Sequence, residues 1–304
     1  MSLRQQIATL NQLPVIGPVG ARLWQYVLLT RVNRPIGAYL LLWPTLWALW
    51  LAADGMPDPY VLFAFVLGVA LMRAAGCAIN DFADRNIDLH VTRTSRRPLA
   101  TRSIRPWEAV AVAVVLALAA FALVLTLNRL TVYLSFFAVA VAAFYPFSKR
   151  LTHLPQIVLG VAFSWAVPMA FAAQTGSVPA LAWLVFTVNL IWTVAYDTIY
   201  AMADKPDDLE IGVKSTAILF GDYDRHMVAL FQALAAIGFV LIGSRFDLGW
   251  LYYAGVAFGV ALFGYQQFLI HDRQPALCFR AFLNNSWVGM VVFIGLVLDY
   301  AFLS

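Results

Sequence analysis

Long stretches without a charged residue constrain this chain more than any other feature of its sequence. Asp, Glu, Lys and Arg are absent from the segments 35–53, 109–128, 130–148, 151–196, 227–244, 248–270 and 281–298. Most of these segments match the ~20 residues that cross the hydrocarbon core of a bilayer. Only 12% of the 304 residues are charged, against roughly 25% in soluble domains. The sequence therefore predicts an integral membrane protein.

The charge-free segments predict nine transmembrane helices. The segment 151–196 is too long for one helix, and the turn signal Gln174-Thr-Gly-Ser-Val-Pro179 divides it into two spans. Residues 60–79 add a span that is interrupted by Arg73. The predicted spans are 36–53, 60–79, 108–127, 131–147, 156–173, 180–201, 227–244, 249–270 and 282–303. We expect an all-α fold in a single domain, 1–304.

The first 35 residues are expected to form an N-terminal segment at the membrane surface. The first 30 residues lack a continuous apolar stretch followed by a small-residue cleavage site, so no cleaved signal peptide is expected. Residues 20–32 mix Arg with Trp, Tyr and Leu. This mixture is typical of an amphipathic helix that lies along the interface.

The positions of Lys and Arg predict the orientation. With the N-terminus inside, the inner segments hold 17 of the 20 Lys and Arg residues, and the outer loops hold only Arg129 and Arg245. The positive-inside rule therefore predicts an N-in, C-out topology. The net charge of +4 is explained by this topology, so nucleic-acid binding is not expected.

The first acidic motif, Asn80-Asp-Phe-Ala-Asp84-Arg-Asn-Ile-Asp88, begins at the inner end of the second predicted span. If the helix continues, Asn80, Asp84 and Asp88 share one face, whereas Asp81 is turned away. Arg73 precedes Asn80 on that face. An ionisable residue inside the membrane is a functional candidate, although an arginine there can also extend its head group to the interface.

The second acidic motif, Asp204-Lys-Pro-Asp-Asp208, follows the sixth predicted span. Asp204 and Asp208 again stand four residues apart, but Pro206 is expected to interrupt a helix there. Asp197, upstream of the motif and inside the span, is a functional candidate for the same reason as Arg73.

Two clusters of carboxylate and amide oxygens favour a Mg²⁺ site, because Mg²⁺ takes one or two carboxylates and completes its shell with water and substrate phosphate. Two facing clusters would hold a diphosphate through bridging ions. The nearby cations that would neutralise the remaining charge are Arg93, Arg96, Arg97, Lys149 and Lys214. The scattered histidines predict no soft-metal site, and Cys77 and Cys278 are not expected to form a disulfide.

Four segments carry a resemblance to a known family. They are Arg34-Pro-Ile-Gly-Ala-Tyr-Leu-Leu-Leu-Trp-Pro44, the first acidic motif with its continuation to Leu99, Tyr145-Pro-Phe-Ser-Lys-Arg150, and the stretch from Tyr196 to Ala217 that contains the second acidic motif. Over nearly its whole length the chain resembles the UbiA-type intramembrane prenyltransferases, and within them the 4-hydroxybenzoate polyprenyltransferases of ubiquinone synthesis.

The resemblance implies helices around a central cavity, with both Asp motifs at its mouth on the cytoplasmic side of a bacterial inner membrane. It implies that Asp84, Asp88, Asp204 and Asp208 are catalytic and, with Asn80, bind Mg²⁺ and the diphosphate. Tyr145 and Lys149 fit the family's YxxxK pattern. The position of Arg150 is expected to help hold the aromatic acid. The roles of Arg73 and Asp197 as substrate-binding residues rest on their helix faces instead.

The reaction implied is transfer of a polyprenyl group from its diphosphate to the ring carbon ortho to the phenol of 4-hydroxybenzoate, with Asp197 a candidate acceptor of the ring proton. The prenyl tail is expected to extend into membrane lipid. A larger naphthoate or homogentisate is the alternative acceptor. A secondary transporter is the alternative from another class, but transporters usually place their charged residues near the midplane, whereas these gather at the inner surface.

Overall fold

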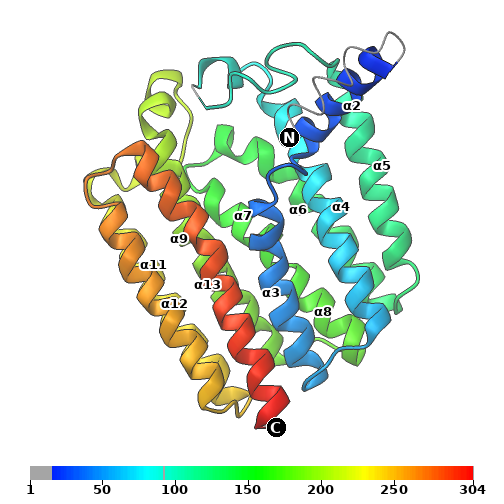
Figure 1. Cartoon of the computed structure of the whole chain (residues 1–304), viewed down its shortest axis with the longest axis vertical. Coiled ribbons are helices and arrows are strands. Elements are labelled where there is room, and N and C mark those ends of the chain that lie inside the picture. The colour runs from blue at the N-terminus through cyan, green and yellow to red at the C-terminus, as the bar shows by residue number, and fades with distance from the viewer. Residues whose placement is uncertain (1–15, 92, 304) are drawn as a thin grey trace.

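The chain folds into a bundle of roughly parallel helices, and the computed structural model describes residues 16–91 and 93–303 (Figure 1). Within these residues there is no strand, so the all-α prediction is confirmed. The elements are α2 (Ile16–Thr30), α3 (Ile36–Ala53), α4 (Pro59–Asp84), η1 (Asp88–His90), α5 (Pro106–Val124), α6 (Arg129–Leu151), α7 (Pro155–Ser164), α8 (Ala166–Thr175), α9 (Ala180–Ile211), α10 (Thr216–Leu219), η2 (Gly221–Tyr223), α11 (Asp224–Arg245), α12 (Trp250–Leu269) and α13 (Pro275–Phe302).

Eight segments of the described chain are long and apolar enough to span a membrane, which makes this an integral membrane protein. They are Ile36–Ala53, Pro59–Asp84, Pro106–Val124, Arg129–Leu151, Pro155–Thr175, Ala180–Ile211, Gly221–Arg245 and Pro275–Phe302. The helix α12 has 20 residues, but Tyr and Gln side chains reduce its hydropathy. The count of nine spans and the N-in, C-out orientation stay predictions.

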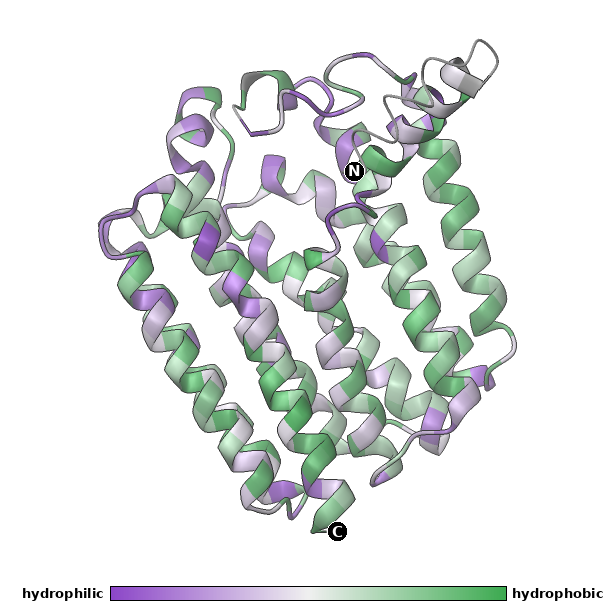
Figure 2. Cartoon of the chain, in the orientation of Figure 1, coloured by the Kyte–Doolittle hydropathy of each residue, from purple (hydrophilic) through white to green (hydrophobic). Residues whose placement is uncertain are grey.

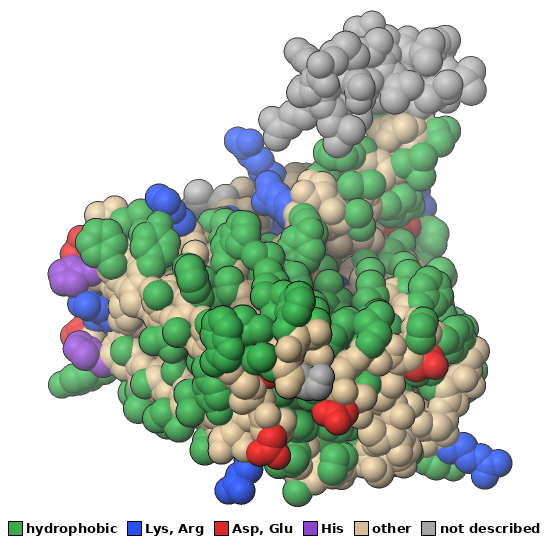
Figure 3. All heavy atoms as spheres, turned by 60° about the horizontal axis from the view of Figure 1, so that its bottom comes forward, with side chains coloured by type: hydrophobic (Ala, Val, Ile, Leu, Met, Phe, Trp, Pro, Cys, Tyr) green, Lys and Arg blue, Asp and Glu red, His purple; other side chains and the backbone are tan. Residues whose placement is uncertain are grey.

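The hydrophilic residues concentrate at one end of the bundle. Figure 2 shows largely hydrophobic helix bodies and mostly hydrophilic segments at the upper end. The view from the lower end, in Figure 3, shows mainly hydrophobic side chains with a few separated charges. Hydrophilic segments therefore gather mainly at the upper end.

The turn predicted at 174–179 divides the long apolar segment as expected. The helix α8 ends at Thr175, and Gly176 follows in the left-handed conformation with φ 74°, which glycine adopts without steric cost. The predicted span 156–173 is itself interrupted at Trp165, between α7 and α8. Pro168 explains this break, because proline has no N–H for the bond to the carbonyl of Ser164.

An aromatic cluster holds the centre of the bundle together. The ring of Trp47 on α3 lies 5.3 Å from the ring of Trp192 on α9 and 5.3 Å from that of Phe239 on α11. The indole N–H of Trp192 donates to Oδ1 of Asn285 on α13, at 3.1 Å. Buried aromatic pairs with a satisfied N–H stabilise packing beyond their buried area, so four helices are fixed against one another here.

Two sequence predictions about the acidic motifs need correction. The helix α4 ends at Asp84, so Asp88 does not continue its face but lies in the short helix η1. The helix α9 runs without a break through Pro206 to Ile211, although Pro206 was expected to interrupt it. Lys205 explains the continuity, because its ammonium donates to the carbonyl of Gly221 and to Asp224 and so anchors the helix extension.

The predicted interfacial segment contains a helix, α2, which covers most of residues 20–32. Its Arg22 donates to Glu108 at the start of α5, and the hydroxyl of Tyr26 donates to the same carboxylate at 2.7 Å. These contacts fix α2 across the upper end of the bundle (Figure 1). The rest of the predicted segment, residues 1–15, lies outside the described residues.

Candidate active site

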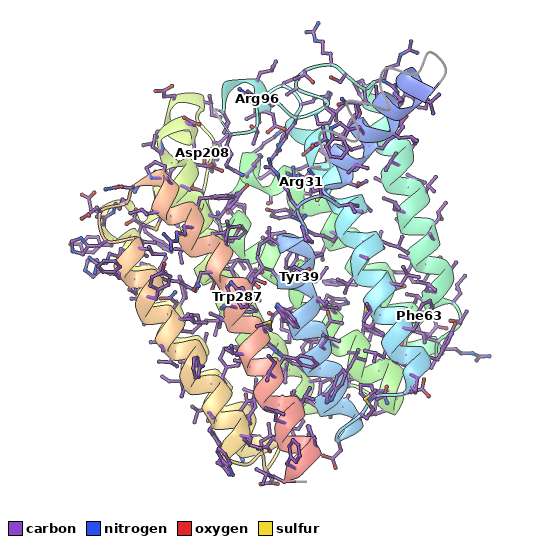
Figure 4. The ribbon with its side chains drawn as sticks, in the orientation of Figure 1. Arg31, Tyr39, Phe63, Arg96, Asp208 and Trp287 are labelled. Atoms are coloured by element: carbon purple, nitrogen blue, oxygen red, sulfur yellow. The ribbon has the colours of Figure 1, made fainter. Side chains whose placement is uncertain are left out.

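A small cavity at the upper end of the bundle, of about 120 Å³, brings both acidic motifs together. We call it the polar chamber. It is lined by the five predicted metal ligands, which are Asn80, Asp84, Asp88, Asp204 and Asp208. Figure 4 shows Asp208 and Arg31 at this end of the bundle. The prediction that two distant motifs face each other therefore agrees with the geometry.

Three of these carboxylates are paired with predicted cations. The ion pairs are Asp84 with Lys149 (2.5 Å), Asp88 with Arg97 (2.9 Å) and Asp204 with Arg93 (2.5 Å). Lys214 also lines the polar chamber. Since unpaired charges are costly to remove from water, the cations allow several carboxylates to lie close together beside the membrane.

The first acidic motif also carries a structural carboxylate. Asp81 is fully buried and pairs with Arg31 and, at 3.2 Å, with Arg97. It does not line the polar chamber, which agrees with its predicted position on the helix. Burial raises the pKa of the neighbouring Asp88 carboxyl, and the guanidinium of Arg97 offsets that shift only in part.

The donor atoms in the polar chamber fit a hard divalent cation. Oδ1 of Asp84 is buried and has no hydrogen-bond partner. Within the described part of the chain, no three His, Cys, Asp or Glu side chains form a metal-binding group by themselves. An ion here would therefore complete its shell with amide, water or substrate oxygens, which is the usual arrangement for Mg²⁺.

A larger cavity of about 510 Å³ adjoins the polar chamber, and we call it the apolar chamber. Its lining comes from helices that include α3, α4, α6, α8, α9 and α13. Asn80, Arg93, Tyr145 and Asp197 line both chambers. A ligand with one charged end and one apolar end can therefore occupy both cavities at once.

Arg73 projects into the apolar chamber beside α3. It lines the cavity, and among the described residues it has no ion-pair partner within 4 Å. A Cβ at Gly37 would overlap its guanidinium. An arginine without a direct ion-pair partner can bind an anion in this cavity.

A family model described as the UbiA prenyltransferase family matches residues 41–294. The chain belongs to this family. It is 57% identical over 280 residues to a 4-hydroxybenzoate octaprenyltransferase of Ectopseudomonas mendocina (strain ymp). The aligned residues cover 92% of this chain and 95% of the relative. The 4-hydroxybenzoate octaprenyltransferase of Marinobacter nauticus is 56% identical over 285 residues, or 93% and 97% of the two chains.

Solved UbiA structures share the fold. The apo structure of a UbiA homolog from Aeropyrum pernix K1 superposes with a TM-score of 0.77 at 25% identity, over 86% of this chain and 97% of that chain. A UbiA homolog from Archaeoglobus fulgidus, bound to DMAPP and Mg²⁺, has a TM-score of 0.69 at 16% identity, over 90% of this chain and 99% of that chain.

One predicted site residue of this UbiA chain is not brought to the cavities. Arg150 is exposed and donates to the carbonyl of Ala83. Its guanidinium carbon lies 5.9 Å from the centroid of the Phe147 ring. It lines neither chamber. Successive helical residues point about 100° apart. Lys149 therefore contacts Asp84 of the polar chamber, whereas Arg150 contacts the carbonyl of Ala83 outside both chambers.

Sequence reasoning missed several residues that line the UbiA cavities. Tyr200 lines both chambers, and the guanidinium carbon of Arg93 lies 4.3 Å from the centroid of its ring. Its position four residues before Asp204 was the available signal. Arg31 and Arg34 line the apolar chamber. Sequence reasoning counted both among the inner-side charges and made neither a site candidate, because such arginines are common in membrane proteins.

Proposed function

We propose that this protein transfers a polyprenyl group from a polyprenyl diphosphate to the ring carbon ortho to the phenol of 4-hydroxybenzoate, with release of diphosphate. The observation that carries the proposal is the junction of the two chambers, where acids and cations lie beside a large apolar cavity. Relatives that are 56–57% identical over almost the whole chain bear the name of this activity.

We place the diphosphate end of the donor in the polar chamber. Arg93, Arg97, Lys149 and Lys214 line it and would bind the diphosphate oxygens. Asn80 and Asp84, with the other acids of the chamber, would hold Mg²⁺. When bound, Mg²⁺ would stabilise negative charge that develops on the leaving group.

We place the acceptor ring at the junction of the chambers, with its carboxylate at Arg73. The allylic C–O bond breaks with its electron pair going to the diphosphate, and a π pair of the ring forms the new C–C bond. The ring carbon then loses its proton, for which Asp197 is the proposed acceptor, because it lines both chambers. Apolar walls would exclude water, which would otherwise trap the allylic cation.

We further propose that the single domain crosses a bacterial inner membrane nine times, with the polar chamber facing the cytoplasm. The concentration of Arg and Lys in the predicted inner segments supports this orientation, and the relatives cited above are bacterial.

The test is transfer of label in proteoliposomes. The protein is incubated with labelled 4-hydroxybenzoate and octaprenyl diphosphate, with Mg²⁺ or with EDTA, and label is followed into the organic phase. The proposal expects a lipophilic product only with Mg²⁺. Product from a naphthoate or homogentisate but not from 4-hydroxybenzoate would reassign the acceptor. Vesicle flux without any covalent product would instead favour a transporter.

A further inference from the structure

An arginine and a group of aromatic rings meet where the two chambers join. Arg93, in the loop between η1 and α5, lines both chambers, and so does Tyr200 of α9. The guanidinium carbon of Arg93 lies 4.3 Å from the centroid of the Tyr200 ring and 5.5 Å from that of Phe279, near the start of α13. Both distances are within the ~6 Å over which an aromatic face attracts a cation. The contact joins three segments that are far apart in the sequence.

The rings that face this guanidinium pack against one another. Phe282, one helical turn along α13 from Phe279, has its ring centroid 4.7 Å from that of Tyr200 and 6.1 Å from that of Phe279. The rings of Tyr200 and Phe279 are 6.3 Å apart. The helix α13 is itself held against α9, because the indole N–H of Trp192 donates to Asn285. The three rings therefore form one packed cluster on helices that are fixed against each other.

The same guanidinium is bonded to the second acidic motif. Nε and Nη2 of Arg93 donate to the two carboxylate oxygens of Asp204, at 3.1 Å and 2.5 Å. A guanidinium has further N–H groups in the same plane, and these can donate to an anion in the polar chamber. Because arginine binds through this planar fork rather than as a point charge, the orientation of the plane decides which oxygens it reaches.

We propose that Phe279 is a positioning residue for the donor. Its ring, together with that of Tyr200, holds the guanidinium of Arg93 in the plane from which it reaches both Asp204 and the donor's diphosphate. Phe279 lines the apolar chamber but not the polar chamber, so its effect on the diphosphate passes through Arg93. This proposal rests on the proposed function, since it takes the anion to be the diphosphate of a prenyl donor.

The test compares variants of Phe279 in diphosphate binding and in transfer. Binding of inorganic diphosphate with Mg²⁺ to the purified protein in detergent is measured by calorimetry, and transfer from octaprenyl diphosphate is measured in proteoliposomes. Phe279→Leu keeps an apolar side chain but removes the π face. We expect it to raise the Kd for diphosphate and the KM for the donor roughly fivefold, with kcat and the acceptor's KM near wild-type values. Phe279→Tyr keeps the ring and should resemble the wild type.

A double-mutant cycle separates positioning from packing. In an Arg93→Ala background, Phe279→Leu should not change the Kd for diphosphate further, because the guanidinium that the ring orients is absent. Phe268→Leu is the control for loss of an aromatic ring. Phe268 lies on α12, is 77% exposed and lines neither chamber, so this variant should bind diphosphate and turn over like the wild type.

Three results would overturn the proposal. They are an unchanged Kd in Phe279→Leu, equal losses in Phe279→Leu and Phe279→Tyr, and an equal effect of Phe279→Leu with and without Arg93. The cycle is measured by binding alone, so it decides the positioning role even if the wild type forms no product. Absence of product from a wild type that binds diphosphate would overturn the proposed function instead.

Discussion

Gly37 on α3 makes room for the guanidinium of Arg73 on α4, because a Cβ at position 37 would overlap that group. Figure 4 shows Tyr39, from the same stretch of α3, at mid-height in the bundle below Arg31. Arg73 itself lies inside the membrane-length segment Pro59–Asp84, away from both of its ends. Under the proposed function, Gly37 therefore leaves space for the side chain that would bind the acceptor's carboxylate.

Gly37→Ala is expected to weaken binding of 4-hydroxybenzoate by moving Arg73. A charged hydrogen bond contributes ~1.5–3 kcal/mol, so its loss raises KM for the acceptor roughly tenfold or more. The KM of the prenyl donor should change less. Steady-state kinetics with each substrate varied in turn measure both values. Gly264→Ala, at an open and exposed position, is the control, and an unchanged acceptor KM in Gly37→Ala would contradict the assignment.

Arg73 and Arg150 give a direct test of the structure against the sequence resemblance. The resemblance assigns the acceptor's carboxylate to Arg150, whereas the structure places Arg73 in the cavity and Arg150 outside it. We expect Arg73→Ala to raise the acceptor KM roughly tenfold or more, and Arg150→Ala to leave it near the wild-type value. The reverse order of effects would restore the assignment to Arg150.

Asp84→Asn should nearly abolish turnover without preventing insertion. Oδ1 of Asp84 is buried without a partner, while Oδ2 binds Lys149. Loss of the carboxylate charge removes a metal ligand and should lower kcat by about two orders of magnitude. The activity that remains should need a higher Mg²⁺ concentration. The exposed Asp272 provides the control, Asp272→Asn, and wild-type turnover in Asp84→Asn would refute the metal site.

The sequence predicted those parts of the site that follow from periodicity. Asn80 and Asp84 are one helical turn apart on α4 and were predicted to share a face of the helix. Both line the polar chamber. Charge-free runs likewise predicted the spans, because a bilayer fixes both helix length and polarity. The α12 segment is equally free of charged residues, but its tyrosines and glutamines lower its hydropathy.

Tertiary contacts decided what periodicity does not specify. Pro206 has the local signature of a helix break, yet contacts of Lys205 with α11 and η2 keep α9 continuous. Lys149 and Arg150 are adjacent cations to which the resemblance gives different roles, and their spacing alone does not show which one faces the acids. Only the rotation of α6 in the folded bundle directs Lys149 to Asp84 and Arg150 to the carbonyl of Ala83.

Asp224 connects the acidic end of α9 to the rest of the bundle and should be important for stability. Its side chain is fully buried and accepts from Lys205 and from Arg273, each at 2.8 Å. Asp224→Ala leaves two cations without their partner. Breaking a fully buried pair costs ~3–5 kcal/mol, and we expect a smaller loss here because both cations are partly exposed.

Thermal unfolding in detergent measures this effect as a lower Tm for Asp224→Ala than for the wild type. The exposed neighbour Asp222 supplies the control, because only its backbone carbonyl accepts from Arg273 and Asp222→Ala keeps that carbonyl. Since Lys205 directly follows Asp204, loosening it should also weaken the second acidic motif and raise the Mg²⁺ concentration needed for half-maximal transfer. Equal Tm values for the two variants would show that the Asp224 ion pairs do not hold α9 in place.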